Sequence, residues 1–243
     1  MQNYRFDIAY DGKDFSGWQI QPNAPSIQET IEKALRLLCK QPIRLMGSGR
    51  TDAGVHALGQ VAHAKCPLPP SLKSLNGILP PTIRILSVTE VPFDFHSQYS
   101  AKSKEYHYHL CLEPVLSPFK RGFCWHIQQP IDLHLLEKGT EAFIGTHDFT
   151  TFSNQANQGS AARNPVRTIK RITLVEEEGG IRLEFEANGF LYKMVRNITG
   201  TLVSVASGKL PLMALPHLLA ARDRRKACPA APPFGLFLFS VYY

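Results

Sequence analysis

The sequence lacks the patterns that mark several large classes of protein. It has five cysteines, an odd number, and no CxxC pair, so neither a zinc ribbon nor a disulfide framework is indicated. Its uncharged apolar stretches, such as residues 234–243, fall well short of the roughly 20 residues that span a bilayer. No basic start followed by an apolar run opens the chain, so no signal peptide is indicated. We therefore expect a soluble, cytoplasmic protein with reduced thiols.

Cofactor and metal motifs are also missing. The glycine-rich segment 47–54 lacks the third glycine of a GxGxxG loop, and no lysine–hydroxyl pair follows it in P-loop order. His107 and His109 could share a strand face, but no third ligand has suitable spacing, so we predict no metal site and no small-molecule cofactor. Acidic residues are the minority, and 27 Lys and Arg against 20 Asp and Glu give a net charge of +7. That excess fits a polyanionic partner or a basic enzyme without one.

The apolar spacing predicts an α+β fold. A chain of 243 residues can bury a core without disulfides or metals. Three- and four-residue spacing predicts helices at residues 26–39, 71–77, 131–143, 191–206 and 211–222. Alternation predicts strands at residues 4–10, 43–46, 59–64, 83–91, 99–112, 168–177, 180–188 and 236–243, with a mobile loop at 153–162. This order favours two similar halves, residues 1–96 and 97–243, each a mostly antiparallel sheet covered by helices.

The segment 47–56, GSGRTDAGVH, is the most informative part of the chain. Its three glycines permit backbone conformations and close approaches that side chains would forbid. Asp52 could cap an ordinary turn within this segment. It could also serve as a nucleophile or base that Arg50 keeps ionised.

Several motifs resemble those of the TruA family of tRNA pseudouridine synthases. The run GRTDAGVHA at residues 49–57, followed by Gly59-Gln60-Val61, is similar to the signature of this family. The other matching segments follow in the family's order and are Tyr10-Asp11-Gly12, Phe15-x-Gly17-Trp18-Gln19, Lys104-x-Tyr106-x-Tyr108, Arg167-Thr168-Ile169, residues 190–198 and Gly235-Leu236-x-Leu238. The resemblance covers nearly the whole chain. Gln98 and Ala64 depart from the pattern, which leaves details of RNA contact open.

The resemblance implies a function and a set of site residues. Members of the family isomerise uridine to pseudouridine at positions 38, 39 and 40 in the anticodon arm of tRNA. They act as homodimers without a cofactor, and their two halves join around a central cleft. The roles that carry over are the nucleophile Asp52, its partner Arg196, the base contact Tyr106 and the nucleotide-holding Arg50. Thr51 and His56 are further candidates for substrate binding, and His56 is either structural or RNA-facing.

The reaction itself suits these residue types. It breaks an N-glycosidic bond and rejoins the base through carbon, with nothing oxidised. Asp52 could attack the ribose C1′ or deprotonate the sugar, and a cation such as Arg196 would keep it ionised. The basic cluster 222–226 could contact phosphates or face solvent. The alternative function is a non-catalytic tRNA-binding protein or RNA chaperone of the same fold, and retention of Asp52 and Arg196 favours the enzyme.

Overall fold

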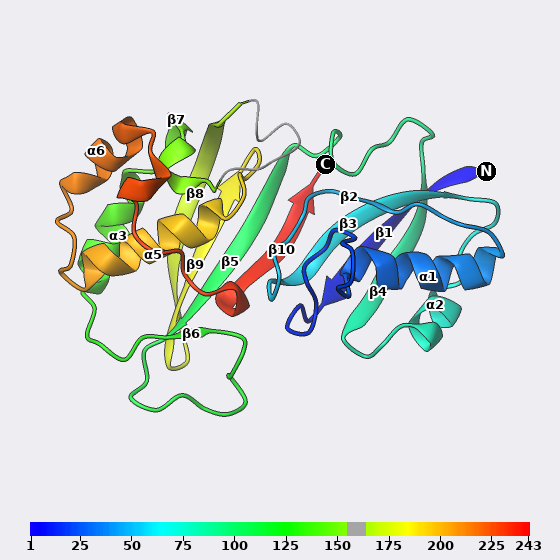
Figure 1. The fold of residues 1–243 in the computed structure, drawn as a ribbon, viewed down its shortest axis with the longest axis horizontal. Coiled ribbons are helices and arrows are strands. Elements are labelled where there is room, and N and C mark those ends of the chain that lie inside the picture. Colours follow the sequence, from blue (N-terminus) through cyan, green and yellow to red (C-terminus); the bar gives the residue numbers. More distant parts are fainter. Residues whose placement is uncertain (155–163) are drawn as a thin grey trace. The chain divides into compact units, whose positions relative to one another are not determined.

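A computed structural model describes residues 1–154 and 164–243 of the chain (Figure 1). The chain divides into two compact units. The first comprises Met1–Lys102 together with Phe237–Tyr243, and the second comprises Ser103–Leu236. The expected boundary at residues 96 and 97 falls within the first unit, near its passage into the second.

The first unit contains one sheet and two helices. Its elements in chain order are β1 (Gln2–Tyr10), α1 (Ile27–Cys39), β2 (Met46–Gly47), β3 (His56–Cys66), α2 (Leu72–Ile78), β4 (Ile83–Val91) and β10 (Leu236–Tyr242). The strands lie in the order β4-β1-β3-β10, and β2 pairs with β3. β1 is antiparallel to both of its neighbours, whereas β10 runs parallel to β3.

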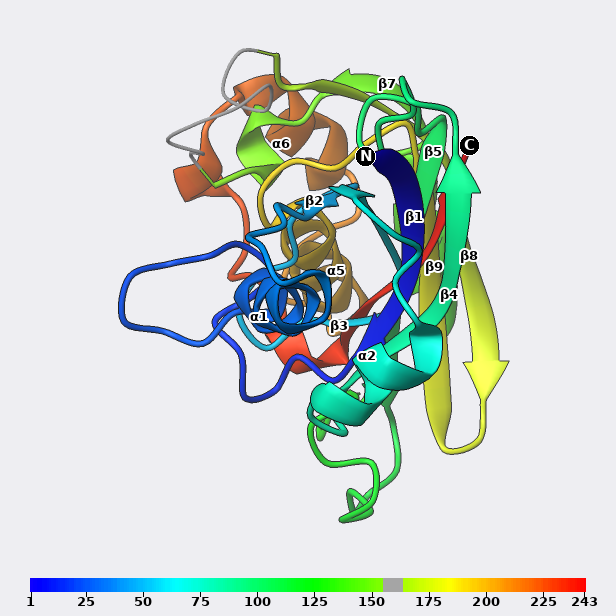
Figure 2. The same ribbon diagram turned by 90° about the vertical axis from the view of Figure 1, so that its right-hand side faces the viewer.

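Local sequence explains the main elements of this unit. Ser26 accepts a hydrogen bond from the Glu29 amide and so caps α1, which satisfies one of the unpaired donors of the first turn. The predicted strand over residues 4–10 is confirmed, because its alternate side chains, Tyr4, Phe6, Ile8 and Tyr10, are buried. Figure 2 shows α1 and α2 on one face of this unit's sheet.

The second unit is larger and carries more helices. Its elements are β5 (Ser103–Cys111), β6 (Trp125–His126), α3 (Leu133–Glu141), β7 (Gly145–Asp148), β8 (Val166–Glu177), β9 (Gly180–Ala187), α5 (Met194–Ala206), α6 (Ala214–Ala221) and the short 3-10 helices η1 (Thr150–Phe152), η2 (Arg224–Lys226) and η3 (Pro233–Gly235). The strand order is β5-β9-β8-β7, all antiparallel, and β6 pairs with β5 in parallel.

The sequence explains the centre of this unit as well. The predicted hairpin of β8 and β9 is confirmed, and its turn places Gly179 at φ +74°, a conformation that favours glycine. Figures 1 and 2 show α5 and α6 together on one face of this unit's own sheet. The fold class is therefore α+β with a mixed, mostly antiparallel sheet, as expected.

Two local predictions and the question of membrane-spanning helices need comment. The strand predicted at residues 43–46 is wrong, since only Met46 pairs, in the two-residue strand β2. The predicted loop at 153–162 lies almost wholly outside the described residues. Within residues 1–154 and 164–243, no helix is long and apolar enough to cross a membrane.

Candidate active site

Asp52 lies on the loop that connects β2 with β3. The Val55 amide donates to the Asp52 carbonyl at 3.1 Å, which closes a turn whose third residue, Gly54, has φ +76°. Asp52 is half-buried, and Arg50 on the same loop is exposed. The loop therefore holds its carboxylate near the surface and its guanidinium in solvent.

A second loop, residues 11–18, clamps the Asp52 loop from one side. The Trp18 amide donates to the Thr51 carbonyl at 3.1 Å, and the Gly54 amide donates to the Phe15 carbonyl at 3.3 Å. Gly17 has φ +91°, and a Cβ at this position would come 2.6 Å from the Thr51 carbonyl oxygen. Glycine is thus required where the two backbones cross.

A network of buried polar side chains supports the Asp52 loop on its interior side. Gln60 is fully buried, donates to the Gly49 carbonyl at 3.0 Å and accepts from Ser48 Oγ at 2.8 Å. The hydroxyls of Tyr10 and Thr51 are 2.7 Å apart, and burial raises the pKa of Tyr10 to about 12. Every one of these groups is satisfied within the first unit, so the network fixes the shape of the loop.

Two of the expected substrate-binding residues are deeply buried. Thr51 is 6% exposed and directs its hydroxyl to Tyr10. His56 is 1% exposed, stacks on Phe237 with ring centroids 4.6 Å apart, and has its Nδ1 3.1 Å from the Gly12 amide, which donates to it. Both side chains therefore shape the loop, and a contact of either with substrate stays a prediction.

Tyr106 and Arg196 lie in the second unit, on the helix-covered side of its sheet. Tyr106 is 7% exposed on β5 and packs edge-to-face against Phe190, with ring centroids 5.0 Å apart. Arg196, in the first turn of α5, donates through side-chain Nε to the Ala231 carbonyl at 2.8 Å, and its backbone carbonyl accepts from the Ala231 amide at 2.9 Å. The structure thus orients each side chain locally. The pairing of Arg196 with Asp52 stays a prediction.

Sequence reasoning gave no role to two neighbouring cations of the second unit, Lys104 and Arg167. Lys104 precedes Tyr106 by two residues on β5, and its pKa is lowered to about 8 by burial and by the charge of Arg167. Arg167 on β8 is half-buried, and burial lowers its pKa as well. Both residues stand in segments that resemble the family's motifs, and that resemblance could have marked them as candidate site residues. Their proximity depends on the pairing of distant strands, which spacing alone does not give.

The basic cluster 222–226 divides into two kinds of arginine. Arg224 is half-buried and donates to the Asn197 side chain at 2.8 Å and to the carbonyls of Ala227 and Cys228. Arg225 is 89% exposed and forms an ion pair with Asp223 at 2.8 Å. Arg224 therefore holds the chain in place, whereas Arg225 is accessible to a polyanion.

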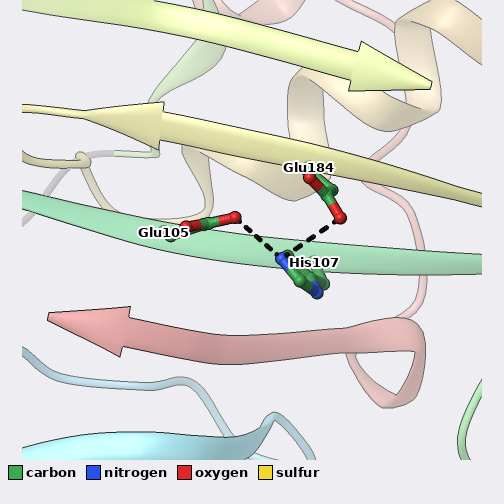
Figure 3. Close-up of side chains that lie close together, drawn as sticks. All are labelled: Glu105, His107 and Glu184. Atoms are coloured by element: carbon green, nitrogen blue, oxygen red, sulfur yellow. Dashed lines mark hydrogen bonds and ion pairs between the residues drawn. The ribbon is translucent and has the colours of Figure 1, made fainter. Parts of the chain in front are cut away.

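One group of side chains could hold a metal by geometry alone. Ligand atoms of Glu105, His107 and Glu184 all lie within 4.8 Å of one another on β5 and β9 (Figure 3). His107 Nε2 is 2.9 Å from Glu105 Oε1, but Arg171 donates to both carboxylates, at 2.8 and 3.1 Å, and Arg182 donates to Glu184 at 2.7 Å. The carboxylates already have cationic partners, so the arrangement is an ion-pair network across three strands.

Comparison with known proteins identifies the class of protein. The family model described as tRNA pseudouridine synthase matches residues 8–100 and 140–243. The chain therefore belongs to the tRNA pseudouridine synthase family, whose members are isomerases.

Individual relatives place the chain more narrowly, beside proteins named tRNA pseudouridine synthase A. It is 55% identical to tRNA pseudouridine synthase A 1 of Protochlamydia amoebophila, over 100% of this chain and 97% of the relative. It is 44% identical to tRNA pseudouridine synthase A of Chlamydia muridarum, over 97% and 90% of the two chains. The protein of that name from Thermoanaerobacter sp. strain X514 is 39% identical over the whole of both chains.

Proposed function

We propose that this protein isomerises uridine to pseudouridine at positions 38, 39 and 40 in the anticodon stem-loop of tRNA. The observation that carries the proposal is the Asp52 loop, a half-buried carboxylate on a backbone held from two sides by residues 11–18 and by the Gln60 network. Precise placement of a reacting group is what such rigid support provides. The +7 charge of the chain suits an RNA substrate.

The proposed chemistry needs no redox cofactor. The bond from ribose C1′ to N1 of uracil breaks, the base turns, and a bond from C1′ to C5 forms while the C5 proton leaves. Asp52 acts either on C1′ as a nucleophile or on the sugar as a base, and both routes require the ionised carboxylate. Arg196 holds that charge, Tyr106 contacts the base and receives or relays the C5 proton, and Arg50 takes the place of the base in the RNA stack.

The proposal includes the setting in which the reaction occurs. The two halves, residues 1–96 and 97–243, adopt the pseudouridine synthase arrangement around a central cleft, and Thr51 and His56 contribute to substrate binding from the first half. The enzyme works as a cytoplasmic homodimer, without a metal or a small-molecule cofactor. The competing function, a non-catalytic tRNA-binding protein or RNA chaperone, requires the same basic surface but no reactive carboxylate.

The decisive experiment separates chemistry from binding. A tRNA transcript with tritium at C5 of uridine releases label as pseudouridine forms, and it is incubated with saturating enzyme in a single-turnover assay. Asp52→Asn should abolish release while tRNA affinity, which depends mainly on phosphate contacts, changes by about 1 kcal/mol or less. Glu90→Gln, the same change at an exposed carboxylate on β4, is the control and should leave both quantities unaltered.

Two outcomes contradict the proposal. Near-normal turnover by Asp52→Asn would make Asp52 a turn cap, because asparagine caps turns as well as aspartate does. Tight tRNA binding by the unaltered protein with no release of label would favour the non-catalytic alternative.

A further inference from the structure

An exposed tyrosine in the first unit packs against a histidine ring at a tilt. Tyr99 is 77% exposed, and its ring centroid is 4.2 Å from that of His96, with an interplanar angle of 30°. His96 in turn contacts the buried ring of His63, with centroids 4.6 Å apart. The phenol therefore packs against His96, whose ring meets that of His63 at an interplanar angle of 59°, and most of the phenol ring faces solvent.

The turn that presents Tyr99 is held internally. The amides of Gln98 and Tyr99 donate to His96 Nδ1 at 3.1 and 3.3 Å, and the Ser100 amide donates to the His96 carbonyl at 2.9 Å. These three bonds all converge on one residue, so the position of the Tyr99 ring follows from the position of His96.

Further bonds fasten the same turn to the sheet. Ser97 is fully buried, and its hydroxyl donates to the Met46 carbonyl at 2.6 Å while its amide donates to His63 Nδ1 at 3.1 Å. The Tyr243 hydroxyl donates to the Ser97 carbonyl at 2.7 Å, and Asn3 Nδ2 donates to the Phe95 carbonyl at 3.0 Å. Strands β1, β2 and β3 and the residue after β10 thus fix a segment whose most prominent side chain is an exposed aromatic ring.

The neighbouring residues add an apolar ring and positive charge. Phe93 is 65% exposed, and Lys65 Nζ lies 3.5 Å from its ring centroid. The segment 92–102 contains one acid, Asp94, and one base, Lys102, so its own formal charge is zero, and Lys65 adds a cation against the Phe93 ring. Proteins bind unpaired nucleotides with aromatic rings and nearby cations, and this segment offers Tyr99, Phe93 and Lys65.

We propose that Tyr99, supported by His96, is a stacking platform for an unpaired base of the RNA substrate, and that Lys65 contacts an adjacent phosphate. The proposal deepens the proposed function, since it depends on RNA being the substrate. It assigns the binding of a nucleotide to residues that have no part in the Asp52 chemistry. A planar imidazole beneath the phenol keeps the ring flat against an incoming base, whereas an isolated exposed tyrosine would lose rotamer freedom on binding.

The first test compares tRNA affinities of the full-length protein. Tyr99→Ala should raise the Kd for tRNA roughly five- to 150-fold, because base–aromatic stacking is worth about 1–3 kcal/mol. Tyr99→Phe keeps the ring and should bind within about twofold of the unaltered protein. Phe119→Ala removes a 91% exposed ring elsewhere and should leave affinity unchanged. At saturating enzyme the single-turnover rate of Tyr99→Ala should equal that of the unaltered protein, so the loss appears in KM and not in kcat.

The second test detects stacking directly. In a Tyr99→Trp variant, the new indole should lose fluorescence when a single-stranded oligoribonucleotide binds, and less when the same sequence is presented as a duplex. Lys65→Ala should flatten the salt dependence of binding by about 0.7 to 0.9 in log–log slope, whereas Tyr99→Ala should leave the slope unchanged.

The outcomes distinguish this proposal from the proposed function. The stacking role of Tyr99 is wrong if Tyr99→Ala binds tRNA as tightly as the unaltered protein, or if single strands do not quench the indole of Tyr99→Trp. Either result holds whether or not the protein forms pseudouridine. If binding depends on Tyr99 but no pseudouridine forms, the platform stands and the chemistry is wrong. A change in oligomeric mass on Tyr99→Ala, with RNA affinity unaltered, would make this surface a protein contact.

Discussion

The hydroxyls of Tyr10 and Thr51 lie 2.7 Å apart in the interior of the first unit, one at the end of β1 and the other beside the proposed catalytic aspartate. Forty-one residues separate them in sequence. Through this bond the end of a core strand sets the position of the residue that precedes Asp52. The support of the Asp52 loop therefore depends on a phenol that has no place in the chemistry.

Tyr10→Phe tests this support. Loss of the phenol hydroxyl leaves buried Thr51 Oγ1 without that partner, and we expect a loss of about 1–2 kcal/mol in unfolding free energy. The single-turnover rate should fall more than tRNA affinity does, because the carboxylate is displaced while phosphate contacts remain. Tyr4→Phe is the matched control on the same strand, where the hydroxyl donates to Gln2 near the surface. Equal rates in the two variants would show that the bond does not position Asp52.

Gly12→Ala should disable the clamp. A Cβ at Gly12 would overlap the Val55 carbonyl, which belongs to the turn that contains Asp52. Because backbone rather than a flexible side chain blocks the space, the loops must separate, and we expect turnover to fall at least tenfold with a lower melting temperature. Gly77→Ala on α2 meets nothing within 4 Å and should instead stabilise the protein by about 0.5–1 kcal/mol. Normal activity of Gly12→Ala would contradict a rigid clamp.

Arginines 224 and 225 should behave in opposite ways. Arg224→Ala removes bonds to Asn197 and to two carbonyls, so it should lower unfolding free energy by about 2 kcal/mol and leave the salt slope of tRNA binding unchanged. Arg225→Ala should leave stability within about 0.5 kcal/mol and reduce the slope by about 0.7 to 0.9. Titrating tRNA binding against salt measures both slopes. A slope unaffected by Arg225→Ala would mean that this arginine faces only solvent.

Stability should fall as pH drops from 6.5 toward 5 because of His63. Burial, with the charges of His96 and Lys65, lowers the pKa of His63 from 6.5 to about 4. The unfolded chain therefore binds a proton in this window that the folded chain does not, and unfolding free energy declines by up to about 1.4 kcal/mol per pH unit. Physically, a protonated Nδ1 could no longer accept from the Ser97 amide.

The contribution of His63 is isolated by substitution. His63→Gln should reduce the slope of unfolding free energy against pH between 6.5 and 5, whereas His134→Gln at an exposed position of α3 should not. Denaturant titrations at several pH values give the slopes. The ion-paired carboxyls of Glu184 and Glu186 do not interfere, because their pKa values are lowered from 4.5 and their contribution is lost only below that pH. An unchanged slope in His63→Gln would contradict the assignment.

Sequence predicted the elements whose signals are local. Helix α1 could be predicted from the sequence because Ser26 marks its start and a regular apolar spacing marks its buried face. Strand β5 could be predicted because Tyr106 and Tyr108 alternate with His107 and His109. Strands β6 and β7 were missed, since two and four residues are too short for any periodicity to develop.

The hydrogen bonds that hold the Asp52 loop and the segment around Ser97 could not be predicted from the sequence. The resemblance supplied Asp52, Tyr106 and Arg196, but alternation alone made Tyr10 a core residue and gave no hint of its bond to Thr51. Likewise Ser97 and His63 are 34 residues apart, and only the folded chain brings them together. Polar contacts between distant residues leave no periodic trace in a sequence.

The parallel pairing of β10 with β3 has a consequence for the order of biosynthesis. Phe237 lies opposite His56, and Leu238 opposite Ala57, at the point where the Asp52 loop enters β3. During translation, β3 must wait for this neighbour until the whole second unit has been made, roughly ten seconds at bacterial elongation rates. Over that interval His56 and Ala57, which follow the Asp52 loop, have no β10 strand with which to pair. Because the chain places this one short strand after the second unit, we expect activity to appear only once that unit has been synthesised.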